Sequence, residues 1–231
     1  RVRGDIQREA GPALVSAMRG LVYDSLRTVD GLIVTDEKRI QDLVAAAAAA
    51  DTVDARATPD LNSVVVEFVI DLHAQLLPAL LNHDRPVPLD PLLRWIPTTD
   101  YTGIVIYAAD PLPVHGTDRV ARVQPALFPG IYYLDETGDG ISRLMEVDHV
   151  SAEYIAQWGP VLYSSDVAGA EFNERAGARP LRIVAYRAFG RYSTDVVISN
   201  GDALQILASE NNRTLIAEGR VVLVLDPGVL D

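Results

Sequence analysis

The chain reads Thr102-Gly-Ile-Val-Ile-Tyr-Ala108 near its middle and Arg220-Val-Val-Leu-Val-Leu-Asp226 near its end, and these two apolar runs decide its fold. Both are short and continuous, which is typical of buried strands. Two further strands are predicted at Leu181–Phe189 and Asp195–Ser199. Strands and helices follow one another without a regular βαβ rhythm. The sequence therefore predicts the α+β class, with a mixed or antiparallel sheet and packed helices.

A β-hairpin and three helices complete the predicted second half. The hairpin joins Pro125–Leu134 to Ile141–Val147 through the turn 135–140, where glycine supplies the positive φ that the turn needs. The first helix is expected to begin at the N-cap Ser151 and to end at Gly159. The second covers Ala168–Ala176 and ends at Gly177. The third runs from Ala203 to about Glu218, with Asn200 or Asp202 as its N-cap.

The first half is predicted to hold a helix, a strand, a helix and a strand. These elements are Pro12–Leu26 with Pro12 in the first turn, Leu32–Val34, a helix capped by Asp36 that continues into Ala45–Ala50, and the alternating segment Val64–Leu72. Pro78 makes Gln75–Leu81 a strand edge or an irregular segment. The six alanines either let another element approach closely or face water, and close packing is the hypothesis we carry forward.

Prolines at positions 86, 88, 91 and 97 predict an extended connector over Arg85–Pro97. We therefore divide the chain into a helix-strand-helix-strand subdomain, residues 1–97, and a strand-rich domain, residues 98–231. One continuous domain is the alternative, because a connector with this much Leu and Trp usually packs against its own domain.

The composition of the chain excludes several classes of function. Twenty basic and 32 acidic residues give a net charge of −12, which argues against binding to nucleic acid or to an anionic lipid surface. The chain has no cysteine, so disulfides, thiolate metal sites and a cysteine nucleophile are excluded. No apolar run is long enough to span a bilayer. The chain begins with Arg1 rather than Met, and we expect it to be a processed or excised piece.

No sequence motif points to catalysis. His73, His83, His115 and His149 lack zinc-ligand spacing, and the turn at Asp135 is too short for a calcium loop. Neither a nucleophile elbow nor a phosphate-binding glycine loop is present. We therefore predict a protein that is not an enzyme, with no catalytic residue, cofactor or metal.

Four residues are candidates for binding a partner. Arg182, Tyr186 and Arg187 form a basic and aromatic cluster on one predicted strand, where they could meet a carboxylate. His115 lies in the loop Asp110–Val123, whose composition is that of an exposed functional loop. A solvated sheet face is the alternative explanation of the cluster.

The order of segments in the second half resembles a known bacterial pattern. The segments are Tyr101–Ala108, Gln124–Tyr132, Tyr154–Gly159, Arg175–Leu181, Thr194–Ser199 with Asp202-Ala203, and Glu218–Asp226. They are similar to the small outer-membrane lipoprotein family that includes flagellar outer-membrane-ring and basal-disk proteins and uncharacterised spirochaete relatives. The first half resembles this family only in outline. The lipidated N-terminal Cys of such proteins is absent, and Asp110–Val123 is longer than the family's link.

This resemblance implies a lipid-anchored protein of the periplasm and outer membrane that assembles with copies of itself. We thus expect a non-enzymatic structural or assembly protein of the cell envelope. It is expected to form a homo-oligomer and to contact other envelope proteins, and association with the flagellum is one form that this role can take. Any contact with the membrane is expected only through a lipid anchor. Two alternatives stay open: a periplasmic binding module for an acidic glycan or peptide, and an unrecognised hydrolase.

Overall fold

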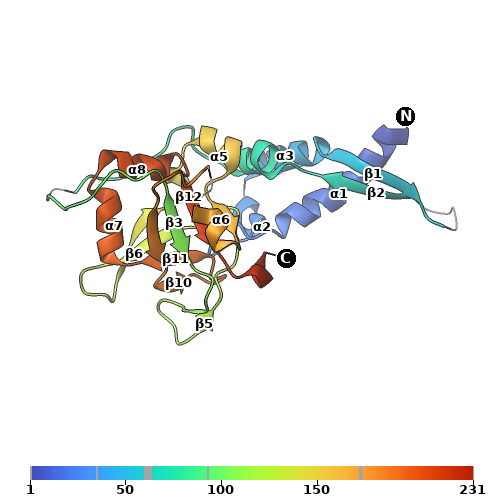
Figure 1. Ribbon diagram of the computed structural model, residues 1–231. Helices are drawn as coiled ribbons and strands as arrows, with labels where there is room; N and C mark the ends of the chain where they lie inside the picture. Colours follow the sequence, from blue (N-terminus) through green and yellow to red (C-terminus); the bar gives the residue numbers. More distant parts are fainter. Residues whose placement is uncertain (1, 35, 60–63, 93, 172–173, 231) are drawn as a thin grey trace.

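The structure is a computed structural model that describes residues 2–34, 36–59, 64–92, 94–171 and 174–230. The predicted α+β class is confirmed: helices predominate in the N-terminal half and strands in the C-terminal half. Figure 1 shows a body that holds the two larger sheets, and an arm that projects from one side of it. Among the described residues, no helix combines the length and the apolar character needed to cross a bilayer.

One sheet of the body is wholly parallel, in the order β8-β12-β3-β9. Its strands are β8 (Leu162–Ser164), β12 (Val221–Val224), β3 (Ile104–Tyr107) and β9 (Leu181–Val184). Every residue of β12 is fully buried, as are the first three of β3. The two apolar runs of the sequence therefore form the central pair of this sheet, as buried parallel strands usually do.

The second sheet is mixed, in the order β10-β11-β6-β7. Its strands are β10 (Arg187–Phe189), β11 (Asp195–Ile198), β6 (Ile131–Leu134) and β7 (Ile141–Met145). The predicted hairpin is confirmed as the antiparallel pair β6–β7, with Gly138 at a φ of 81° in its turn. The predicted sheet type is confirmed here, whereas the wholly parallel sheet was not anticipated.

The two sheets share one hydrophobic core, which also includes buried residues from the first half such as Met18 and Leu43. A smaller cluster of Val105, Val222, Val224 and two alanines lies on the opposite face of the parallel sheet. The remaining elements of the body are β4 (Leu112–Pro113), β5 (Val120–Ala121), η2 (Val147–His149), α5 (Ala152–Trp158), α6 (Val167–Glu171), α7 (Asn200–Leu207), α8 (Glu210–Ala217) and η3 (Pro227–Val229).

A buried arginine fastens α5 to the turn before β12. Arg175 donates hydrogen bonds to the carbonyl oxygens of Trp158 at 2.8 Å and of Gly159 and Gly219, each at 2.5 Å. Its guanidinium carbon lies 5.3 Å from the centre of the Trp158 ring. Burial lowers the pKa of Arg175 to about 9, which is still high enough for the side chain to stay charged at neutral pH.

The first half supplies the arm, which we define as strands β1 (Asp51–Ala57) and β2 (Val64–Val69), and the helices that precede and follow it in sequence. Its elements are α1 (Val2–Arg19), α2 (Val29–Ile33), α3 (Glu37–Ala48), β1 (Asp51–Ala57), β2 (Val64–Val69), the π-helix η1 (Leu72–Leu76) and α4 (Leu77–Leu80). Strands β1 and β2 form an antiparallel pair of their own. The helix capped by Asp36 and the strand that begins at Val64 are confirmed.

Three predictions for the first half are wrong. Leu32 and Ile33 are helical, because the Thr28 hydroxyl accepts a hydrogen bond from the Gly31 N–H and caps α2. Gln75 to Leu80 is helical as well, because Pro78 falls in the first turn of α4, where a missing N–H costs no hydrogen bond. Helix α1 begins at Val2 and ends at Arg19, so Pro12 lies inside it.

Three boundaries in the second half also differ from prediction. The run Leu181–Phe189 is two strands, β9 and β10, which belong to different sheets. The helix expected from Ala203 is divided into α7 and α8, and its N-cap is Ser199, whose hydroxyl accepts from the Asp202 N–H. Helix α6 covers only the start of the predicted 168–176 segment, in which residues 172 and 173 lie outside the described chain. The connector 85–97 contains no helix or strand in its described residues.

The alanine-rich end of α3 gives a test of packing. Helix α3 packs against α1 and α4, and Ala47 is 2% exposed whereas Ala48 is exposed. Ala47→Leu should lower the free energy of unfolding by about 1–3 kcal/mol, because it overfills a packed contact. Ala48→Leu, the matched control, should change it by less than about 0.5 kcal/mol. Urea denaturation measures both, and equal effects would show that the alanines do not mediate close packing.

Candidate functional site

The structure brings together two of the four residues predicted to bind a partner. Arg187 opens β10, and its Nη1 lies 3.1 Å from Nδ1 of His115. A guanidinium can only donate, so Nδ1 of His115 accepts and the ring proton lies on Nε2. Tyr186 is exposed in the link that precedes β10, and Arg182 is exposed on β9 in the parallel sheet. Arg182 is therefore separated from the other three by the change of sheet.

The loop that carries His115 is attached to β10 by its backbone. Val114 forms a parallel bridge with Ala188, and the His115 N–H donates to the Ala188 carbonyl at 2.8 Å. The loop then turns at Gly116, whose φ is 74°, and returns through β5. This attachment, which the sequence did not reveal, is what places the imidazole beside Arg187.

Aromatic side chains extend this pair across the mixed sheet. The ring of Phe189 lies 6.1 Å from His115 and 4.9 Å from Tyr132, in edge-to-face contacts. All four side chains are partly buried. We call His115, Arg187, Phe189 and Tyr132 the basic–aromatic surface. Its chemistry, a charged guanidinium and an imidazole N–H donor beside apolar rings, suits a ligand with a carboxylate and some apolar area.

A small cavity of about 170 Å³ adjoins this surface at Tyr132. The segment between α1 and α2 forms one wall, through Tyr23 and Ser25, and the mixed sheet forms the other, through Gly130 and Asp195. Gly130 is required here, because a Cβ would lie 2.8 Å from the Tyr132 ring and 3.0 Å from an Asp195 oxygen.

Asp195 is the most unusual group of the cavity. Its carboxylate is 2% exposed and accepts hydrogen bonds from the Gly130 N–H at 2.8 Å, from Thr194 Oγ1 at 3.2 Å and from Ser25. Burial outweighs these bonds and raises the pKa of Asp195 to about 6. The sequence analysis missed this residue, and its only signal was an acidic residue at the start of the apolar segment DVVIS.

The rim of the cavity is held by a second carboxylate. The Tyr132 hydroxyl donates to Glu146 at 2.6 Å, and Arg143 donates to the other Glu146 oxygen at 3.0 Å. Burial, together with the hydrogen bond to Glu146, raises the pKa of Tyr132. Tyr132 is therefore a neutral donor at physiological pH, and it orients the aromatic part of the surface.

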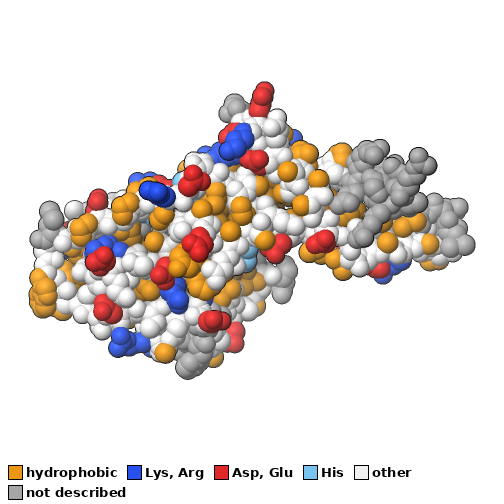
Figure 2. Space-filling model, turned by 90° about the horizontal axis from the view of Figure 1, so that it is seen from above, with side chains coloured by type: hydrophobic (Ala, Val, Ile, Leu, Met, Phe, Trp, Pro, Cys, Tyr) orange, Lys and Arg blue, Asp and Glu red, His pale blue; other side chains and the backbone are white. Residues whose placement is uncertain are grey.

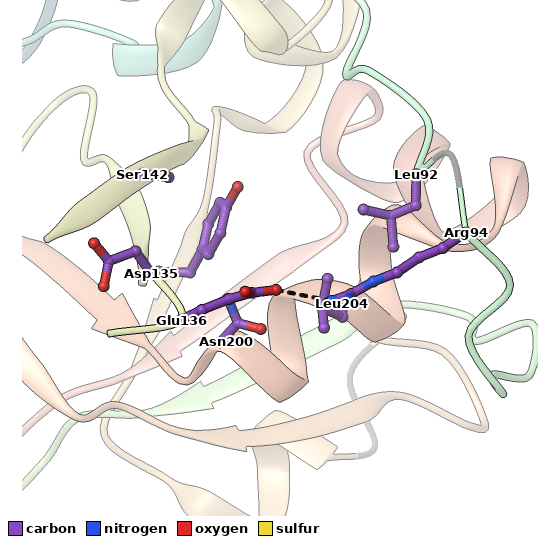
Figure 3. Close-up of a pocket in the computed structure, with 8 residues that line it drawn as sticks. Leu92, Arg94, Asp135, Glu136, Ser142, Asn200 and Leu204 are labelled. Atoms are coloured by element: carbon purple, nitrogen blue, oxygen red, sulfur yellow. Dashed lines mark hydrogen bonds and ion pairs between the residues drawn. The ribbon is translucent and has the colours of Figure 1, made fainter. Parts of the chain in front are cut away.

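A larger and more open pocket, of about 450 Å³, lies over the hairpin turn (Figure 3). Arg94 of the connector reaches Glu136 across it, with a nitrogen–oxygen distance of 3.3 Å. Asp135 points away from this pair and accepts from Thr137 and Gly138, and the hydrogen bond from Thr137 is the main cause of its lowered pKa. In the described part of the chain, no group of three or more His, Asp or Glu side chains is placed to hold a metal.

The partly buried His83 and the buried His149 make local contacts. Nε2 of His83 lies 2.9 Å from the Val150 carbonyl oxygen. His149 receives the Glu146 N–H on Nδ1 at 3.2 Å, and an Asp148 oxygen lies 2.9 Å from the same nitrogen. These contacts cap and join the segments around η2.

The arm is the second candidate surface. Six of the seven residues of β1 are exposed, and valines are exposed on both strands: Val53 at 62%, Val64 at 59%, and Val65 and Val69 at 49%. Figure 2 shows hydrophobic side chains along the described part of the arm, away from the body. Exposed apolar side chains next to unpaired strand edges are a common property of surfaces that bind other chains.

The fold and its surfaces define an α+β domain in which a parallel and a mixed sheet share one core, with an arm attached before it. The family described as Treponema pallidum Tp0624, second domain, matches residues 103–227, more than half of the chain, and the chain belongs to this family. The predicted relationship to spirochaete proteins is confirmed at this level. The match includes both four-stranded sheets and excludes the arm. Comparison with curated proteins gives no match.

Replacement of Asp195 tests the electrostatics of the cavity. The folded chain holds the Asp195 proton more tightly than the unfolded chain, because the pKa is about 6 instead of 3.8. The protonated Asp195 therefore contributes fully to the free energy of unfolding below about pH 4, and this contribution is lost as the pH rises through 6. The free energy of unfolding changes by about 3 kcal/mol over this range. The free energy of unfolding of the wild type minus that of Asp195→Asn should thus be about 2–3 kcal/mol larger at pH 4 than at pH 7 in urea titrations. A difference independent of pH would contradict the raised pKa.

Proposed function

We propose that this protein is a non-enzymatic structural or assembly protein of the bacterial cell envelope that binds copies of itself. The observation that carries the proposal is the arm, whose two strands expose apolar side chains and pair only with each other within the described chain. A two-stranded hairpin is marginally stable by itself in water, and burial of its valines against another molecule removes apolar area from solvent. An arm of this kind gains stability on assembly.

The location and partners of the proposal come from the family resemblance. Proteins of the outer-membrane lipoprotein type, with the flagellar ring and basal-disk proteins among them, face the periplasm and form assemblies. A protein of this type would contact other envelope proteins as well as its own copies, and would reach the membrane through a lipid anchor. The net charge of −12 is consistent with partners other than nucleic acid.

Sedimentation velocity over a range of concentrations tests the self-association. The 25.1 kDa chain should give a species heavier than the monomer, and its fraction should rise with protein concentration. The measurement should be made with the arm present and also with residues 51–69 replaced by a short flexible linker. A strict monomer at every concentration of the complete chain would remove the proposal.

The basic–aromatic surface favours a second candidate function, the binding of an acidic glycan or peptide. Arg187 is held beside His115 and next to an aromatic ring, an arrangement that can receive a carboxylate. Arg187→Ala should reduce retention on immobilised poly-glutamate or polygalacturonate by about tenfold, since a charge-assisted hydrogen bond contributes about 1.5 kcal/mol or more. Arg182→Ala, the same change on the other sheet, is the matched control. Equal retention of wild type and both variants would count against this function.

A further inference from the structure

We propose that two copies of the chain pair through the outer edges of their β1 strands, antiparallel and around a twofold axis at Ala55. The result is a continuous four-stranded sheet in the order β2-β1-β1-β2. This inference rests on the proposed self-association and specifies its interface. Its partner is a second copy of the same chain, and a twofold axis makes the contact self-complementary and closed.

The edge of β1 is available for pairing. In the described part of the chain β1 pairs with β2 alone, and of its seven residues only Thr52 is partly covered. A bulge between Thr52 and Asp54 interrupts the register with β2, and pairing is regular from Asp54 to Ala57. The proposed axis lies inside this regular stretch, where an added strand can follow the ladder.

The charges of β1 select the register. Asp54 and Arg56 are two residues apart, so their side chains lie on the same face, with Arg56 Nε 3.9 Å from Asp54 Oδ2. An antiparallel pairing centred on Ala55 places Asp54 of each copy opposite Arg56 of the other, and so forms two ion pairs across the strands. Centres at Asp54 or at Arg56 would instead oppose like charges, as would a parallel pairing in register.

Within one chain Asp54 has a distant ion pair with Arg56 of its own strand, at 3.9 Å, and a repulsive neighbour on β2. Asp54 lies directly across from Glu67 of β2, and two carboxylates in opposite positions destabilise a strand pair. An Arg56 from a second copy, on the other side of Asp54, offsets that repulsion. The outer edge of β2 lacks this property, because Glu67 is its only charged residue between Val64 and Val69. The observations therefore favour pairing between β1 edges.

Single cysteines test the axis without background, because the chain contains no cysteine. Directly opposed residues of an antiparallel pair have Cα atoms about 4.5–5.5 Å apart, which suits a disulfide. Ala55→Cys should therefore form a disulfide dimer under mild oxidation of the 231-residue chain. Ala57→Cys should not, since the two copies of residue 57 are separated along the strand by about 13 Å.

Charge exchange tests the register independently. Asp54→Arg alone and Arg56→Asp alone should each weaken self-association by about tenfold, as two opposed pairs become repulsive. An equimolar mixture of the two variants, or the double variant Asp54→Arg/Arg56→Asp, should restore it. Lys38→Asp, which makes the same change of charge as Arg56→Asp but on α3, is the control. Circular dichroism confirms that each variant is folded.

The outcomes separate this inference from the proposed function. If the wild type self-associates but Ala55→Cys does not cross-link and both charge variants associate normally, another surface mediates assembly, so the β1 pairing is wrong and the proposed function stands. If the wild type stays monomeric at all concentrations, the proposed function fails, and the β1 pairing fails with it. Cross-linking at Ala55 together with rescue in the mixed charge variants supports both.

Discussion

Burial of both faces of the β3–β12 pair is the constraint on which the rest of the structure depends. Strands this apolar need cover on each side, and in the chain the mixed sheet supplies the core on one face while α6 and its neighbours cover the other. Arg175 is one consequence, because its buried guanidinium satisfies one carbonyl group in the turn that leads into β12 and two at the end of α5. The mixed sheet in turn keeps one face for the core and leaves the other to carry the basic–aromatic surface.

The strands that pack into this core could be predicted from sequence, because a short apolar run between turn residues is typical of a buried strand. The misassigned segments depend on contacts that no local pattern records. Leu32–Val34 is apolar like a strand, but a cap at Thr28 makes its first residues helical. The run 181–189 changes sheets at Ala185–Tyr186, and no Gly, Pro or Asn in the run marks such a change. Strand β1, Asp-Thr-Val-Asp-Ala-Arg-Ala, has too little apolar alternation to be recognised, because almost all of its side chains are exposed and it packs no apolar face into the core.

The candidate site was predictable in part for the same reason. Arg187 and His115 were found as exposed basic groups, but their contact depends on a backbone bridge between Val114 and Ala188, 74 residues apart in sequence. Asp195 was not found, because its burial requires the segment around Ser25 from the other half of the chain. Arg182, grouped with them in sequence, lies on a sheet edge, where a charged side chain is a common protection against unwanted strand pairing.

The strand edges of the body differ from those of the arm, and this difference explains why the arm is the part suited to assembly. The body's edge strands are short: β8 and β10 have three residues, β10 is bridged by the loop at Val114, and β9 and β7 carry Arg182 and Arg143. These features oppose the addition of a strand. The arm has longer strands with exposed valines, and the charges of its β1 edge are of opposite sign two residues apart. Such a spacing repels copies in the adjacent registers centred at Asp54 or Arg56 and attracts them in the register centred at Ala55, so the arm combines exposed apolar area with a preference for one geometry.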